Sequence, residues 1–499
     1  MDKKILLTAT ILAVFSMLIL SSCGGGNKKN TNDGLTTTFI GSFSSDLISA
    51  AGSGIIKISA PNGNFGTISQ NVDTSRDSNF EIKGLRTGDG QTLVITFPNN
   101  DKYTYTATFK PNAKTTTVIS FSDLIPINKS KWSMFIYIAG DNSLSSQALT
   151  DLKEMTAANF STDDLQVIVF YDNKAAGANI YRVNGDGTCT LMFVLNEPDS
   201  GLPETAANFF ACAKEIAPGS KYIAEFWDHG TGWDTDYDIR GNEFSSKSIA
   251  IDDNTKNGIR LIDLKHALSA FFVGNNTPIS GKIDIVFTDA CLMGAIEVAC
   301  ELENSASYLV ASPDQTPVTG ANYTSLLTEI GDNASSSAKN IAILIEKNYT
   351  QSIKDARWQP MATAYDLNYA NDFAVTLNNY ITSHSKKLSG YYNYDTAKQG
   401  NSIYRFNVPG SSMMYDLMEF IGDDFSSYIS GDFDDFVISA GYLRSPNTSF
   451  NGLPYRTVGI FFPSDGTFSV GNKEYQAYGW LKFSKLSPAW YTHLLNIRN

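Results

Sequence analysis

Two of the chain's less frequent side chains follow hydrophobic runs and could act together in acyl transfer. His229, one of four histidines, comes just after the run Ile223–Trp227, and Cys291, one of five cysteines, comes shortly after Ile283–Phe287. Ligands of open α/β sheets bind beyond the carboxyl ends of the strands, so these two side chains could meet in one crevice. A nearby imidazole activates a thiol as a nucleophile. The pair therefore predicts a cysteine nucleophile with a histidine partner.

Each residue also has a purely structural interpretation. His229 could cap a turn, and Cys291 could be a buried thiol, which is the usual fate of an isolated cysteine. The sequence after Cys291 favours a helix over Leu292–Leu302. Cys291 would then lie at a helix N-terminus, where unpaired N–H groups and the helix dipole lower the pKa of a thiol.

From Lys131 onward, apolar runs typical of buried strands alternate with segments typical of helices. Strands that are hydrophobic throughout must be covered on both faces, so this alternation predicts an α/β domain over residues 131–499 with a mainly parallel sheet between helical layers. We expect strands at Trp132–Ala139, Val167–Tyr171, Tyr222–Trp227 and Ile283–Phe287. We expect a helix that starts at Asp141–Ser143 and runs to about Ala158, and further helices at Ala206–Ile216, Leu261–Phe272 and Leu292–Leu302.

Residues 36–127 read differently, as short β-rich runs separated by Asn, Gly, Pro and Asp. This spacing predicts a small all-β sandwich domain. The segments Asn79–Leu85 and Leu93–Ile95 resemble the carboxypeptidase-regulatory or transthyretin-like sandwich. The region contains no histidine and no cysteine, which favours a spacer or packing module over a binding module.

The N-terminus reads as an export signal. Lys3 and Lys4 precede the apolar run Ile5–Leu20, which is shorter than a membrane span of about 20 residues but suits a secretory leader. The run ends in Leu-Ser-Ser-Cys23-Gly, which resembles a bacterial lipobox and predicts lipidation of Cys23 after removal of residues 1–22. Residues 23–35 would then form a flexible tether. The position after Cys23 is Gly rather than Asp, which indicates the outer membrane of a Gram-negative cell; a plain signal peptide is the alternative.

The composition excludes several classes of partner. Lys and Arg total 38 against 51 Asp and Glu, a net charge of −13, which argues against nucleic acid. The cysteines and histidines show no zinc-ligand spacing. Asp234–Asp238 begins like an EF-hand loop, but Ile239 replaces the required Gly and Ser245 replaces the final Glu. We therefore expect no metal and no cofactor from these motifs.

The segment Asp228–Gly230 followed by Asp289–Gly294 resembles the clostripain family of cysteine endopeptidases, relatives of the caspases, legumains, gingipains and separase. Together the two motifs are specific, whereas either alone is not. The resemblance covers roughly Lys131–Arg498 and implies a caspase-like αβα sandwich. Some members of the family use calcium, so an acidic calcium site is left open. Three further segments are similar to the family: Tyr137–Asn142, Ile262–Leu264 and Tyr308–Ser312.

The resemblance also implies roles for individual residues. Cys291 would be the nucleophile and His229 its acid and base, and the amide groups of Gly230 and Cys291 would form the oxyanion hole. Asp289 would lie at the base of the S1 pocket and bind Arg or Lys of protein and peptide substrates. The alternative for Asp289 is an N-cap of the helix that follows Cys291.

Members of this family are made as precursors that cut themselves between the two motifs. In this chain the polar segment Asp234–Lys247 contains Arg240 and Lys247 as sites of self-cleavage, with an ordinary exposed loop as the alternative. The processed protein would be a monomer of two associated chains. A different class of function is a catalytically silent lipoprotein that binds peptide or glycan with the same fold.

Overall fold

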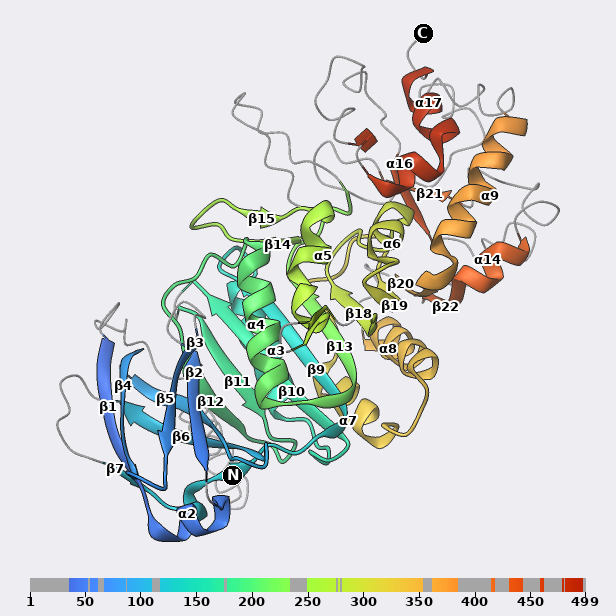
Figure 1. Ribbon diagram of the computed structural model, residues 1–499. Coiled ribbons are helices and arrows are strands. Elements are labelled where there is room, and N and C mark those ends of the chain that lie inside the picture. The colour runs from blue at the N-terminus through green and yellow to red at the C-terminus, as the bar shows by residue number, and fades with distance from the viewer. Residues whose placement is uncertain are drawn as a thin grey trace, which may run out of the picture.

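The structure is a computed structural model in which an N-terminal β domain precedes a larger α/β domain (Figure 1). It describes residues 36–496 except for 53, 62–66, 87, 110–116, 175–176, 234–248, 275–276, 279–280, 353–360, 385–413, 418–429, 443–457, 462–477 and 480.

The N-terminal domain consists of two small sheets around one hydrophobic core. One sheet has the order β4-β1-β7 and the other β3-β2-β5-β6-β8, and a short helix, α2 (Ser45–Ala51), follows the first strand. Apolar residues alternate along these strands, so each sheet buries one face. The domain is built mainly of strands, as predicted, but it also contains the short helix α2. Its strands are β1 (Thr36–Phe43), β2 (Ile55–Pro61), β3 (Thr67–Asp73), β4 (Asn79–Arg86), β5 (Gly88–Thr96), β6 (Lys102–Phe109), β7 (Thr117–Ile119) and β8 (Ile125–Pro126).

The α/β domain is built on a nine-stranded sheet with the order β12-β11-β10-β9-β13-β18-β19-β20-β22. The five strands from β10 to β19 in this order are parallel, and the two strands at each edge are antiparallel. The predicted mainly parallel sheet is thus confirmed. The strands are β9 (Ser130–Gly140), β10 (Leu165–Asn173), β11 (Asn179–Val183), β12 (Cys189–Val194), β13 (Gly219–Trp227), β18 (Ile283–Asp289), β19 (Ala306–Ala311), β20 (Met361–Asp366) and β22 (Val437–Tyr442).

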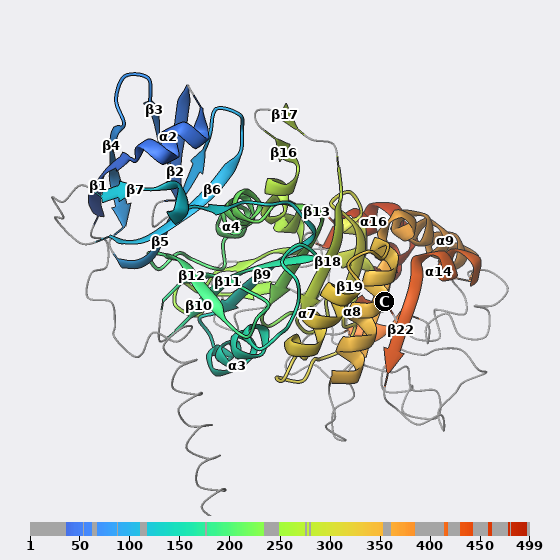
Figure 2. The same ribbon diagram turned by 90° about the horizontal axis from the view of Figure 1, so that it is seen from below.

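Helices cover both faces of this sheet, and a separate hydrophobic cluster fills each side. Figure 2 shows α3, α7 and α8 on one face and α4 on the other. The first face carries α3 (Ser145–Thr156), α7 (Tyr323–Asp332) and α8 (Ala338–Ser352). The second face carries α4 (Pro203–Ile216), α5 (Leu264–Ala267), α6 (Ile296–Leu302), α9 (Ala370–Ser383), α14 (Ser430–Phe436), α16 (Lys482–Leu486) and α17 (Pro488–Asn496).

Short two-stranded elements complete the domain. They are β14 (Ile249–Ile251) with β15 (Gly258–Ile259), β16 (Val273–Gly274) with β17 (Thr277–Pro278), and β21 (Met414–Asp416) with β23 (Gly459–Phe461).

The two domains are packed together along β5 and β12. Thr92 of β5 donates from its hydroxyl to the carbonyl oxygen of Met192 at 3.0 Å, and both groups are buried. Val94 of the same strand belongs to the hydrophobic cluster of the α/β domain. The β domain is therefore docked on the edge of the large sheet rather than connected to it only through the chain.

Two predicted helices differ from the structure near the site. The segment predicted as a helix over Leu261–Phe272 divides into two 3₁₀ turns around the short helix α5. The helix predicted to begin at Leu292 begins at Ile296 instead. Leu292 has a φ of 64°, a left-handed conformation that cannot continue a right-handed helix. Among the described residues, no helix is long and apolar enough to span a membrane.

Candidate active site

The two candidate motifs lie at the ends of neighbouring parallel strands. Trp227 of β13 pairs with Asp289 of β18, and the amide of Asp228 donates to the carbonyl oxygen of Asp289 at 3.3 Å. His229 lies two residues after Trp227, and Cys291 lies two residues after Asp289, its partner in the sheet. This register brings the two segments together at the carboxyl ends of two central strands, as the sequence predicts.

Gly230 brings the two backbones into contact. A Cβ atom at this position would lie 2.2 Å from the carbonyl oxygen of Cys291 and 3.1 Å from its nitrogen. No side chain fits there, so glycine is required for close approach rather than for an unusual φ. The same residue forms an isolated β-bridge with Ile249, at the start of β14.

His229 is partly buried and contacts the turn between β9 and α3. Its Nε2 atom lies 2.8 Å from the hydroxyl of Ser143. Burial lowers the pKa of His229 below its ordinary value, and the nearby charge of Asp253 offsets part of this. The imidazole is therefore favoured in its neutral form at pH 7, as a base that accepts the proton of a thiol must be.

Cys291 lies in a turn and is contacted by Thr316. The Thr316 amide donates to Sγ at 3.2 Å, and the Thr316 hydroxyl lies 3.4 Å from Sγ. Burial raises the pKa of the Cys291 thiol, and these two contacts act in the opposite direction. The resting sulfur is thus favoured as a thiol rather than a thiolate.

The predicted position of Cys291 at a helix N-terminus is wrong. The helix starts five residues later, at Ile296, because Leu292 turns the chain and its amide donates to the carbonyl oxygen of Asp314 at 3.0 Å. The Gly294 amide likewise donates to Ser312 at 2.7 Å. The segment after the thiol is therefore bound to the chain beyond β19, and Thr316 donates to the sulfur where a helix terminus was expected.

Asp289 is 5% exposed, and three groups donate to its carboxylate. These are the Ala321 amide at 2.8 Å, the Tyr349 hydroxyl at 2.9 Å and the Tyr323 hydroxyl at 3.0 Å. Burial raises the pKa of Asp289, whereas the three hydrogen bonds lower it. The N-cap of α6 is Ala295, so the alternative role of Asp289 as that cap is excluded.

Further carboxyl groups surround Asp289. Glu225 lies two residues before Trp227 on β13, and Asp151 of α3 accepts from the Trp227 indole at 2.7 Å. Burial and the charge of Asp289 raise the pKa of Asp151 to about 8. Glu154 is one turn further along α3 and accepts from the Tyr323 amide at 3.2 Å. The site is therefore strongly acidic in composition on the α3 face of the sheet.

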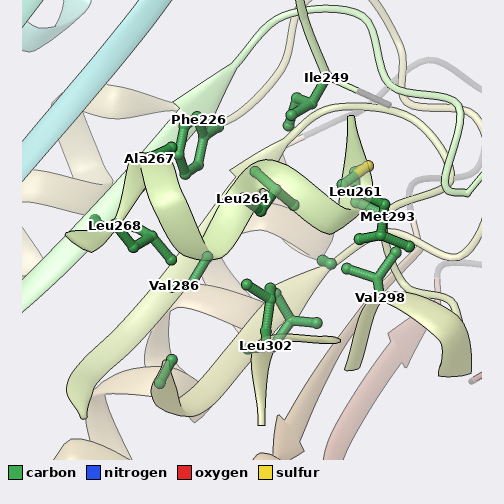
Figure 3. Close-up of a cluster of buried hydrophobic side chains, with 14 of the residues drawn as sticks. Phe226, Ile249, Leu261, Leu264, Ala267, Leu268, Val286, Met293, Val298 and Leu302 are labelled. Carbon is green, nitrogen blue, oxygen red and sulfur yellow. The ribbon is translucent and has the colours of Figure 1, made fainter. Parts of the chain in front are cut away.

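The base of the site is fixed by polar and apolar contacts. Asp228 is buried, and it accepts from the Asn142 side chain at 2.6 Å and from the Ile251 amide. The hydrophobic cluster on the α4 side of the sheet includes Phe226 of β13 and Met293, which follows Cys291 by two residues (Figure 3).

Sequence reasoning missed Ser143, Thr316, Tyr323 and Tyr349. Ser143 follows the family-like segment Tyr137–Asn142, which was a usable signal. The other three come from segments beyond β19, and nothing in their local sequence distinguishes them from ordinary loop and helix residues.

Arg240, Lys247 and the lipidation residue Cys23 lie outside the described residues, as does the segment Asp234–Asp238. Within the part of the chain that is described, no three His, Cys, Asp or Glu side chains are grouped so as to hold a metal ion.

Comparisons with known proteins agree with this architecture. The family model of Peptidase C11, the clostripain family, matches residues 136–431. A solved secreted C11 cysteine protease of Bacteroides thetaiotaomicron, in complex with an irreversible peptide inhibitor, has a TM-score of 0.54 at 20% identity and covers 72% of this chain and 99% of its own. An inactive zymogen C11 protease of Parabacteroides distasonis has a TM-score of 0.54 at 17% identity, with the same coverage of 72% and 99%. The search of curated proteins finds no match. The match to the family model spans more than half of the sequence, and the chain therefore belongs to the clostripain family of cysteine proteases.

Proposed function

We propose that this chain is an exported, lipid-anchored endopeptidase that cleaves after Arg or Lys, with Cys291 as nucleophile and His229 as acid and base. The observation that carries this proposal is the contact between Gly230 and the Cys291 backbone, because it holds the two candidate catalytic segments side by side. The function also agrees with the family of the chain.

The chemistry follows from the groups at this edge of the sheet. Cys291 Sγ attacks the scissile carbonyl carbon while the thiol proton passes to His229. The amides of Gly230 and Cys291 stabilise the oxyanion, each by about 3 kcal/mol. The imidazolium then protonates the leaving amine as the C–N bond breaks, which leaves a thioester. Water, deprotonated by His229, releases the acid and restores the thiol.

The resting dyad is best described as a neutral pair. Burial raises the pKa of the Cys291 thiol and lowers that of the His229 imidazole, so both effects oppose a preformed thiolate–imidazolium pair. Transfer of the thiol proton to His229 therefore accompanies the attack of the sulfur. Bound substrate excludes water from the site, and the lower dielectric constant strengthens the electrostatic contacts there.

Specificity for a basic P1 residue rests on the acidic surroundings of Asp289. Asp151, Glu154 and Glu225 lie near it, and within the described residues no Lys or Arg forms an ion pair with any of the four. A guanidinium or ammonium group would supply a positive charge opposite the carboxylate of Asp289. A neutral P1 residue would leave the buried carboxylate uncompensated.

Two further parts of the proposal concern residues that the structure does not describe. Cleavage after Arg240 or Lys247 would convert the precursor into two chains. These chains would stay associated, because β13 and β18 are neighbours in one sheet. Acylation of Cys23 would hold the protein at the cell envelope, in the outer membrane of a Gram-negative cell.

The test is peptide cleavage by the purified protein, with peptides that differ only in a P1 residue of Arg, Lys, Leu or Glu. We expect cleavage of the Arg and Lys peptides alone, and its loss in both Cys291→Ala and His229→Ala. Circular dichroism of each variant controls for the fold. Full activity of Cys291→Ala would contradict the nucleophile. Peptide binding without turnover by the wild-type protein would instead indicate a silent binding protein.

The role of Asp289 is tested separately with the same peptides. Asp289→Ala should lose the preference for Arg and Lys, whereas unchanged preference would place the P1 contact elsewhere. Asp289→Asn is the matched variant, because it keeps the shape of the side chain and removes its charge.

A further inference from the structure

The hydroxyl of Tyr323 lies between two buried carboxyl groups. Its oxygen is 3.0 Å from Asp289 Oδ2 and is also within hydrogen-bond distance of Glu225 Oε1. A tyrosine hydroxyl carries one proton and can donate only one hydrogen bond at a time. If both carboxyl groups were ionised, one of the two contacts would join oxygen atoms with no proton between them.

The surroundings of the two groups indicate which of them holds a proton. Asp289 also accepts from the Ala321 amide and the Tyr349 hydroxyl, so its negative charge is well solvated by donors. Glu225 is 0% exposed near the carboxyl end of β13, and its Oε2 atom has no hydrogen-bond partner within the described structure. An ionised carboxylate in that position would be very costly, whereas a neutral acid would not.

The charged and titratable groups facing Glu225 favour the same assignment. They come from three elements: Asp151 on α3, Asp289 on β18 and Tyr323 on α7. All of them are acids, and burial together with the charge of Asp289 raises the pKa of Glu225 well above its ordinary value.

We infer that Glu225 is a protonated acid that donates to the Tyr323 oxygen and thereby directs the Tyr323 proton to Asp289. Glu225 is then a positioning residue. Glu225 of β13 donates to Tyr323 of α7, and Tyr323 donates to Asp289 of β18, so that Asp289 is the carboxyl group that stays ionised. The consequence for binding of a basic P1 residue rests on the proposed role of Asp289.

Protonation of Glu225 can be measured without reference to activity. A protonated carboxyl group gives a C=O infrared band apart from that of carboxylates. We expect the difference spectrum between wild-type protein and Glu225→Gln at pH 7 to contain one such band, assigned to the wild type. If Glu225→Gln removes no protonated-acid band, or if Asp289→Asn removes that band instead, the inference is overturned. This outcome does not depend on the P1 specificity of the enzyme.

The positioning role is tested by kinetics with Arg and Lys peptides. Glu225→Leu removes the donor, and Tyr323→Phe removes the intervening hydroxyl while deleting a single oxygen atom. Tyr323→Phe should raise KM roughly ten-fold with a smaller change in kcat, because the hydrogen bond to the charged Asp289 is lost. Glu225→Leu should raise KM by a smaller factor, because Tyr323 still donates to Asp289 and loses only the donor that orients its hydroxyl. Glu225→Gln should restore KM relative to Glu225→Leu, because its amide donates to the Tyr323 oxygen as a neutral acid does.

A buried Tyr–Glu pair on the opposite face of the sheet provides the control. Tyr478 donates to Glu297 at 2.7 Å, and both residues are buried. Tyr478→Phe should therefore lower stability without changing KM. Equal KM values for Glu225→Leu and wild type would overturn the positioning role. Asp289→Ala that keeps basic specificity would overturn the S1 proposal and leave the infrared result on Glu225 standing.

Discussion

The Thr316 amide donates to Cys291 Sγ at 3.2 Å, and the hydroxyl of the same residue lies 3.4 Å from the sulfur. One residue, 25 positions downstream of the thiol, thus contacts it with both its backbone and its side chain. In a turn where no helix terminus is available, these are the contacts that lower the pKa of Cys291 against the effect of burial.

Removal of the Thr316 hydroxyl should make the thiol less reactive. Thr316→Val keeps the shape of the side chain and the amide donor but loses the hydroxyl, so the pKa of Cys291 should rise further. The thiolate fraction at pH 7, and with it the rate of alkylation by iodoacetamide, should fall by a few-fold. Thr316→Ser is the control and should react like wild type. An unchanged pH midpoint for alkylation in Thr316→Val would contradict this prediction.

A side chain at position 230 should disable the enzyme while sparing the fold. In Gly230→Ala the new Cβ would meet the Cys291 carbonyl oxygen at 2.2 Å, and two backbone segments must separate. A displacement of about 1 Å at reacting groups costs about 100-fold in rate, which is the loss that we expect in kcat/KM. Gly431→Ala is the matched control, because no atom lies within 4 Å of its added Cβ. Comparable activity of the two variants would refute the proposed close approach.

Asp151 should make the protein less stable as the pH rises. Its pKa is about 8 in the folded protein and near 3.8 when unfolded, so between these values the folded state holds a proton that the unfolded state has lost. The free energy of unfolding should therefore fall by about 1.4 kcal/mol per pH unit from this group across that window. Asp151→Asn should remove this dependence, measured by urea denaturation at pH 5 and pH 8 in a Cys291→Ala background. Asp434→Asn, at an exposed carboxyl, should keep the wild-type slope.

The alternation of apolar strands and helices was sufficient to predict the central sheet, because the spacing of apolar residues along a segment is a local property of the sequence. The turn that contains Cys291 was not predictable in the same way. Nothing in the sequence after Cys291 indicates that Leu292 adopts a left-handed conformation, since that geometry depends on hydrogen bonds to Asp314 and Ser312 beyond the next strand. Contacts between distant segments also determine the partners of the predicted site residues.

Asp289 illustrates the same limit within the site. Its position two residues before the thiol identified it as a candidate, but its carboxylate is held by donors from the segment Ala321–Tyr323 and from Tyr349 of α8. The local sequence equally allowed an N-cap. Only the late start of α6 excludes that alternative.

Lipidation should be visible as a change of fraction. Cys23→Ala should move the protein from the membrane fraction to the soluble fraction, because a lipid chain is the attachment that the lipobox predicts. Fractionation and metabolic labelling with a fatty acid measure this directly. Wild-type protein that takes up no label, or a variant that stays with membranes, would contradict the lipid anchor.

Self-cleavage should depend on Cys291 and on the two basic residues between the motifs. Wild-type protein should separate into two chains on denaturing electrophoresis, with a new N-terminus at Gly241 or Ser248, and should remain one species in native gel filtration. Cys291→Ala should remain a single chain, because the thiol that makes the cut is absent. The double variant Arg240→Gln/Lys247→Gln should also remain a single chain, although it keeps the thiol. Added wild-type enzyme should cut Cys291→Ala but should not cut this double variant. This pair of variants separates a missing nucleophile from a missing cleavage site. Processing of Cys291→Ala without added protease would show that another enzyme makes the cut.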